Sequence, residues 1–146
     1  MKFVQETGLN ILIHGYEAGM VSITGINADH PEIKNRVIDE WDADNHLGLI
    51  RKSVQIHTNG QLKAWKPQNI SEFSPEHFLT FEEEKPEIVL FGTGKYLSFP
   101  SQECLSVLQQ NQIGYEVMDT AAACRTFNVL AAEGREVILA IIMIEE

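Results

Sequence analysis

The sequence predicts a single α/β domain, in which a β-rich N-terminal half packs with a C-terminal βαβαβ unit whose strands run parallel. Three observations lead to this prediction. The chain has 146 residues, the usual size of one domain, and 44% of them are hydrophobic. Short apolar or alternating runs fill the first half, whereas strand-type runs alternate with helix-type segments from residue 86 onward. Such alternation predicts right-handed crossovers between parallel strands.

The first half contains two predicted pairs of strands. Residues 9–13 and 20–24 are short apolar or alternating runs separated by glycines. Residues 53–57 and 61–65 flank Asn59-Gly60, a dipeptide that tolerates the positive φ angles of a tight hairpin turn. We therefore expect at least one antiparallel hairpin before the middle of the chain.

Between these strand pairs lies an acidic segment, residues 27–48, that predicts a short helix. Its apolar residues recur at helical spacing and are Ile33, Val37, Ile38 and Trp41. Pro31 suits the first position of such a helix. We interpret the segment as a helical insertion and expect it to lie at the periphery of the core.

The carboxylates and histidines of the same segment raise the question of a metal site. These residues are Asp29, His30, Asp39, Glu40, Asp42, Asp44 and His46. A calcium loop counted from Asp42 would need glycine at its sixth position, which Leu47 occupies instead. His14, His57 and His77 are scattered and form no ligand pattern. We therefore expect a solvated acidic loop and no metal site.

The second half predicts a regular order of elements. Predicted strands cover residues 88–91, 115–118 and 137–144, and predicted helices cover residues 100–111 and 119–133. Another helix is expected to begin at Ser74-Pro75, with the serine as cap and the proline at the first position. Three aromatic residues are expected to anchor that helix to the core: Phe73, Phe78 and Phe81.

Charge and cysteine content exclude several classes of function. The formal net charge is -10, from 21 acidic and 11 basic residues, and the basic residues form no cluster. Such a surface repels nucleic acid and anionic membranes, so neither is expected as a partner. Cys104 and Cys124 have no CxxC spacing, which suits a reducing compartment rather than a disulfide framework or a zinc site. No signal-peptide core or membrane span is visible, and we expect a cytoplasmic protein.

A candidate pocket lies where the strand at 88–91 ends. Its residues are Gly92, Thr93, Gly94, Lys95, Asp119 and Thr120. Parallel strands would bring both segments to one carboxyl edge of the sheet, where ligands of open α/β sheets bind. A dinucleotide fingerprint is incomplete, because Leu97 takes the place of its third glycine. We interpret the glycines as serving a turn or close packing and Asp119 as the helix cap, and keep a bound ligand at this edge as the alternative.

The predicted helix at 119–133 has two distinct faces. Its inward face holds Ala123, Cys124, Phe127, Leu130 and Ala131. Cys124 is therefore interpreted as a core residue rather than a nucleophile. The outward face forms a candidate interface of Ala122, Arg125, Val129 and Ala132. Arg125 either contacts another protein or pairs with Glu133 or Asp119 in its own chain.

The C-terminal stretch resembles a widespread family. The resemblance is carried by residues 86–94 (PEIVLFGTG), Phe99-Pro100, residues 115–130 (YEVMDTAAACRTFNVL) and Glu133-Gly134-Arg135, and more loosely by His14-Gly15-Tyr16, Asn59-Gly60 and Trp65. Prokaryotic members of this family are small proteins of unknown function. Mitochondrial members are assembly factors for respiratory complex I, the NADH–ubiquinone oxidoreductase.

The resemblance implies a three-layer α/β fold and a non-enzymatic accessory or assembly role with a protein partner. No catalytic residues carry over from it, and no cofactor is expected. This chain departs from the family pattern in its acidic segment 27–48, and we expect it to lack a targeting extension. The alternative function is a small-ligand-binding protein or enzyme that uses the candidate pocket. The sequence does not predict an oligomeric state.

Overall fold

The computed structural model describes residues 11–143 of the chain. The strands are β1 Leu12–Glu17, β2 Met20–Thr24, β3 Glu40–Asp42, β4 Leu47–Ile50, β5 Val54–His57, β6 Leu62–Ala64, β7 Ile88–Gly92, β8 Gly114–Met118 and β9 Val137–Ile141. The α-helices are α1 Pro31–Lys34, α2 Leu79–Glu84, α3 Gln102–Gln110 and α4 Thr120–Ala132, and the 3-10 turns η2 Ile70–Glu72 and η3 Pro75–Phe78 precede α2. No described helix is long and apolar enough to cross a membrane.

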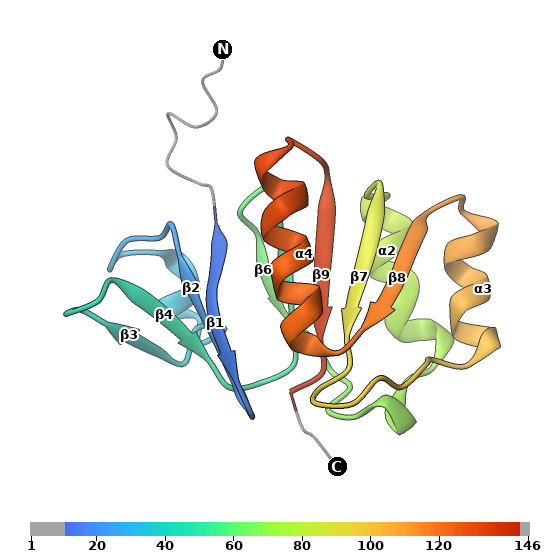
Figure 1. The fold of residues 1–146 in the computed structure, drawn as a ribbon, viewed down its shortest axis with the longest axis horizontal. Helices are drawn as coiled ribbons and strands as arrows, with labels where there is room; N and C mark the ends of the chain where they lie inside the picture. Colours follow the sequence, from blue (N-terminus) through green and yellow to red (C-terminus); the bar gives the residue numbers. More distant parts are fainter. Residues whose placement is uncertain (1–10, 144–146) are drawn as a thin grey trace.

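The strands form two separate sheets (Figure 1). The N-terminal sheet has the order β1-β2-β4-β3 and is antiparallel throughout. The second sheet has the order β6-β5-β9-β7-β8, in which β7 runs parallel to both β8 and β9. These parallel pairs confirm the predicted βαβαβ unit, with α3 and α4 as its crossover helices.

The five-stranded sheet is the middle of three layers, as the residues of β9 show. Val137, Leu139 and Ile141 belong to a core that also contains α4 and the N-terminal sheet. Ile138 and Ala140 belong to a second core, on the face covered by α2 and α3 (Figure 1). All residues of β9 are buried, as expected for a strand covered on both faces. The structure confirms a single α/β domain with three layers.

The second core is built around aromatic rings. Trp65 contacts Phe73, Phe78, Phe81 and Phe91 with ring centroids 5.1–6.3 Å apart. These contacts confirm the predicted anchoring role of the phenylalanines before and within η3 and α2. The predicted helix start is also confirmed in place, with Ser74 as the cap and Pro75 at the first position of η3. The aromatic packing fixes the path of the chain from β6 to β7.

Element boundaries agree closely with the sequence in most of the chain. The predicted hairpin is present as β5 and β6, and Gly60 in its turn has a φ of 96°. The helices predicted at 100–111 and 119–133 are α3 and α4. The strand predicted at residues 9–13 begins later, as β1, and residues 9 and 10 lie outside the described part. The last strand ends at Ile141 rather than at residue 144, which also lies outside it.

The prediction for residues 27–48 is wrong beyond the first helical turn. Only α1 is helical, and Arg36 just after it has a φ of 65°, which does not continue a right-handed helix. The chain then forms the β3–β4 hairpin, whose strand β4 pairs with β2. The helical spacing gave a wrong prediction because Trp41 packs against the core from a strand, not from a helix.

The same segment is not peripheral, contrary to the expectation that it is an insertion at the edge of the core. Ile38 is only 1% exposed and belongs to the core shared with α4. Gly48 of β4 lets this residue approach, because a Cβ there would meet Ile38 at 3.3 Å and Ile26 at 2.9 Å. The acidic side chains of segment 27–48 therefore lie on the outer surface of a segment that itself forms part of the N-terminal sheet.

Candidate functional site

The two segments of the candidate pocket, the loop after β7 and the start of α4, come together at the carboxyl edge of β7 and β8, where hydrogen bonds of Thr93, Gly94 and Thr120 join them. The Gly94 N–H donates to Thr120 Oγ1 at 2.7 Å, and the Thr120 N–H donates to the Gly94 carbonyl at 2.9 Å. The Thr93 N–H donates to the carbonyl of Met118 at 3.0 Å. These bonds fasten the loop after β7 to the start of α4.

Close packing accounts for Gly92, and helix capping accounts for Asp119. A Cβ at position 92 would lie 3.0 Å from Thr120 Oγ1 and 3.2 Å from Thr120 Cα, tighter than ordinary contacts. The Asp119 carboxylate accepts the Ala122 N–H at 2.9 Å, which confirms its capping role. These polar groups are used within the protein. A ligand bound at this edge stays a prediction.

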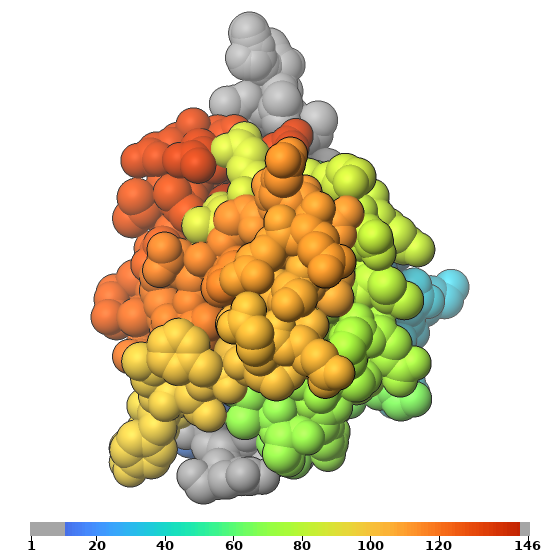
Figure 2. Space-filling view, turned by 90° about the vertical axis from the view of Figure 1, so that its right-hand side faces the viewer, coloured from blue at the N-terminus to red at the C-terminus, as the bar shows by residue number. Residues whose placement is uncertain are grey.

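The segment between this loop and α3 carries an apolar surface that the sequence analysis missed. Tyr96, Leu97 and Phe99 are 64%, 55% and 65% exposed. Thr93 Oγ1 donates to the Tyr96 carbonyl at 2.8 Å and accepts the Ser98 N–H at 3.2 Å, which shapes the loop. The loop projects at the lower left of Figure 2. We call Tyr96, Leu97 and Phe99 the aromatic loop; three large apolar residues in four positions between two elements were its signal in the sequence.

The two predicted faces of α4 are present. Ala123, Cys124 and Phe127 are buried, and burial raises the pKa of the Cys124 thiol to about 12. On the candidate interface, Arg125, Val129 and Ala132 are exposed and Ala122 is half-buried. No ion pair found among the described residues involves Arg125, so neither intramolecular partner considered for it is used.

A groove of about 280 Å³ lies between α4 and the edge strand β1. It is lined by Ile13, His14, Gly15, Tyr16, Ala121, Cys124, Arg125 and Asn128. Asn128 bridges the two elements, because its amide accepts the Ile13 N–H and donates to the Ile13 carbonyl, each at 2.9 Å. The register of β1 against β2 shifts between Ile13 and Gly15, so His14 sits at a β-bulge.

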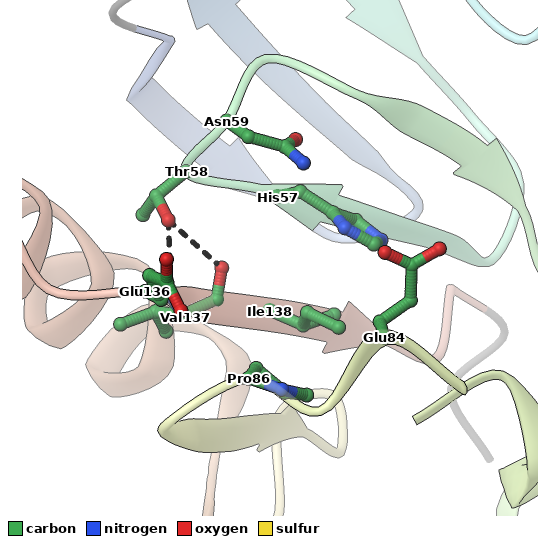
Figure 3. Close-up of a pocket in the computed structure, with 8 residues that line it drawn as sticks. All are labelled: His57, Thr58, Asn59, Glu84, Pro86, Glu136, Val137 and Ile138. Atoms are coloured by element: carbon green, nitrogen blue, oxygen red, sulfur yellow. Dashed lines mark hydrogen bonds between the residues drawn. The ribbon is translucent and has the colours of Figure 1, made fainter. Parts of the chain in front are cut away.

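A smaller cavity of about 120 Å³ lies at the end of the central sheet where β5 ends and β9 begins (Figure 3). His57 from β5 and Glu84 from the end of α2 point toward one another there. His57 is 3% exposed, and no described group bonds its Nε2. Burial lowers the pKa of His57 to about 4, helped by the positive charge of Lys63 and opposed by Glu84. Sequence reasoning missed this histidine, because it stands alone at the end of a strand.

Glu84 is held by a basic neighbour rather than by His57. Lys63 Nζ lies 2.8 Å from Glu84 Oε2, and this hydrogen bond lowers the pKa of the carboxyl group. Within residues 11–143, no group of three or more His, Cys, Asp or Glu side chains is arranged to hold a metal ion. At neutral pH the cavity therefore presents an uncharged imidazole beside an ionised carboxylate, whose charge is balanced by that of Lys63.

The family model described as "Protein of unknown function (DUF498/DUF598)" matches residues 13–142. This chain belongs to that family. Among curated relatives, human NADH dehydrogenase (ubiquinone) 1 alpha subcomplex assembly factor 3 is 38% identical over 79 residues, which are 54% of this chain and 42% of the relative. The Bos taurus protein of the same name is 37% identical over 73 residues, covering 49% and 40%. The chain thus matches less than half the length of these relatives.

Solved structures share the fold over nearly the whole chain. A Xanthomonas campestris protein solved by NMR has a TM-score of 0.69 and 25% identity, covering 91% of this chain and 84% of that one. A Bordetella pertussis protein described as a Mth938-like domain has a TM-score of 0.67 and 20% identity, covering 94% and 87%. A Bartonella henselae protein described as an outer membrane protein has a TM-score of 0.67 and 24% identity, covering 91% and 94%.

Proposed function

We propose that this protein is a non-enzymatic accessory factor that binds another protein during assembly of a multi-subunit complex. The aromatic loop is the observation that carries the proposal. Similarity over about half of the chain to relatives named as NADH dehydrogenase assembly factors supports it, and makes a respiratory complex the first candidate. Both cysteines are free and buried, which suits the reducing cytoplasm.

The aromatic loop has the composition of a protein contact surface. Six large hydrophobic residues are exposed in the described chain, and three of them form this loop. Single exposed apolar residues are ordinary on protein surfaces, whereas a cluster marks an interaction site. Aromatic residues are enriched where proteins meet, because they bury much area with few rotatable bonds. The Thr93 hydroxyl holds the loop in shape, so that little order has to be gained on binding.

The only described thiol in the β1–α4 groove is a poor candidate for nucleophilic chemistry. The Cys124 thiol has a pKa of about 12, because burial disfavours the thiolate. A nucleophilic cysteine would need the opposite shift, with a base beside it. This observation favours binding over catalysis in the groove.

The proposal can be tested by changing all three loop residues to serine. We expect the variant Tyr96→Ser, Leu97→Ser, Phe99→Ser to keep its melting temperature and to lose proteins that the wild type captures from its native host. The matched control is Leu79→Ser on α2, which removes an apolar side chain that is 49% exposed elsewhere. Identical captured sets for wild type and loop variant would refute the proposal. A change in molar mass on size exclusion would instead assign the loop to self-association.

A further inference from the structure

We infer that the groove between β1 and α4 receives a carboxylate side chain from an acidic, partly apolar segment of the partner protein. The inference deepens the proposed protein-binding function and rests on it. It concerns a second contact, separate from the aromatic loop. Four features of the groove lead to it: its charge, the position of its hydrogen-bonding groups, its size and its neighbour on α4.

The groove is a basic spot on an acidic protein. The chain has 21 acidic and 11 basic residues, yet none of the residues within 11–143 that line the groove carries a carboxylate. Arg51, Lys52, Lys63 and Arg135 each pair with a carboxylate, whereas Arg125, like Lys34 and Arg36, takes part in no ion pair of the described residues. Arg125 differs from those two residues in lining the groove. An arginine in this setting offers an open, always charged site to an anion.

The groups that could hold an anion are placed by the fold. Asn128 uses its side-chain amide to bond the Ile13 backbone, which fixes β1 beside α4. Arg125 and His14 are then the basic side chains among the described residues of the groove. The β-bulge directs His14, since bulges change the direction of a side chain relative to its strand. A guanidinium fork matches the two oxygens of a carboxylate, and an imidazole can donate one further bond.

Size and surroundings favour a side chain of a protein segment over a free anion. The groove measures about 280 Å³ and is also lined by Ile13, Ala121 and the neutral Cys124, which suit an aliphatic stem. Val129, one helical turn beyond Arg125 on the same face of α4, is 57% exposed. A segment with an acidic and an apolar residue would contact both, whereas a free carboxylate would use the groove alone.

The probe is a twelve-residue acetylated peptide that carries one glutamate and one leucine four residues apart, with a glutamine-for-glutamate twin and glutarate as comparisons. Binding is followed by NMR shifts of the Asn128 side-chain amide and of Arg125 Nε. We expect the acidic peptide to bind at least about tenfold more tightly than its twin. Arg125→Gln should remove this preference, and Lys34→Gln on α1 should keep it.

Each other outcome overturns part or all of the inference. Absence of shifts with both the acidic peptide and glutarate at millimolar concentration would refute the carboxylate site, as would equal binding of the twin. Glutarate that binds as tightly as the peptide, with no effect of Val129→Ser, would assign the site to a free carboxylate and refute the peptide segment. The capture experiment on the aromatic loop is independent, so that failure of the proposed function and failure of this site remain distinguishable.

Discussion

Lowering the pH from about 7.5 to about 5 should destabilise the fold by about 2 kcal/mol through His57 alone. The imidazole has an ordinary pKa of 6.5 and a pKa of about 4 in the folded protein, because burial disfavours its charged form. Between these values the unfolded chain binds a proton that the folded protein does not. Stability is therefore fully present above pH 6.5 and is lost as the pH falls toward 4.

The magnitude follows from the distance between the working pH and the ordinary pKa. A pH of 5 lies about 1.5 units below the pKa of 6.5 that His57 has in the unfolded chain, and each unit corresponds to about 1.4 kcal/mol. The opposing field of Glu84 and the reinforcing field of Lys63 are already contained in the folded pKa. Carboxylates such as Glu84 add their own loss only near and below their ordinary value of 4.5.

The assay is urea unfolding at several pH values from about 7.5 to about 4.5, for wild type and for His57→Leu. The variant should lose the part of the pH dependence that lies between 6.5 and 4.5. It should also be no less stable at neutral pH, since it removes a buried nitrogen that lacks a partner. His46→Gln, which changes an exposed histidine, is the control and should keep the wild-type profile. Parallel profiles for wild type and His57→Leu would refute the reasoning.

Four substitutions test the packing around α4, each by urea unfolding at neutral pH. Asn128→Ala should cost about 1–3 kcal/mol, because it leaves the β1 backbone groups without their partner. Gly92→Ala should cost about 1–3 kcal/mol, because the added methyl meets Thr120 at 3.0–3.3 Å. Asp119→Ala should cost about 0.5–2 kcal/mol through loss of the helix cap. Ile38→Ala should cost about 2–5 kcal/mol, because it opens a cavity in the core.

Conservative replacements serve as controls for the last two of these substitutions. Asp119→Asn keeps a capping oxygen and should retain most of the stability. Ile38→Val should cost only about 0.5–1.5 kcal/mol. If Ile38→Ala were neutral, the segment 27–48 would be peripheral after all, and its replacement by a short glycine–serine connection would leave a cooperative fold.

Local signals were sufficient for the parallel half of the fold. The cap at Asp119, the glycine after α4 and the apolar run of β9 each determine an element within a few residues of themselves. The segment 27–48 failed because its apolar spacing fits a helix while its strands form through pairing with β2, a contact that no local pattern contains. Propensity is a weak guide where tertiary pairing decides.

The candidate site likewise contains residues that the sequence predicts and residues that it does not. Arg125 was predicted as an outward residue because the period of one helix decides its face. The groups across the groove from it are His14 and the Ile13 backbone, which Asn128 of α4 holds in place. Their position depends on how β1 packs against α4 over a separation of more than a hundred residues. His57 was missed for a related reason, since its burial is created by the end of α2 and the start of β9.

One helix therefore connects the structural and the proposed functional features. Its first turn is fastened to the loop that leads into the aromatic residues, through Thr120 and Gly94. Its middle holds the N-terminal sheet through Asn128, and its outer face carries Arg125 and Val129. A partner that contacts both the aromatic loop and the groove would therefore bind at both places where α4 holds another part of the fold. Binding there should then protect the β1 amides from hydrogen exchange, because it would oppose local opening of the edge strand from α4.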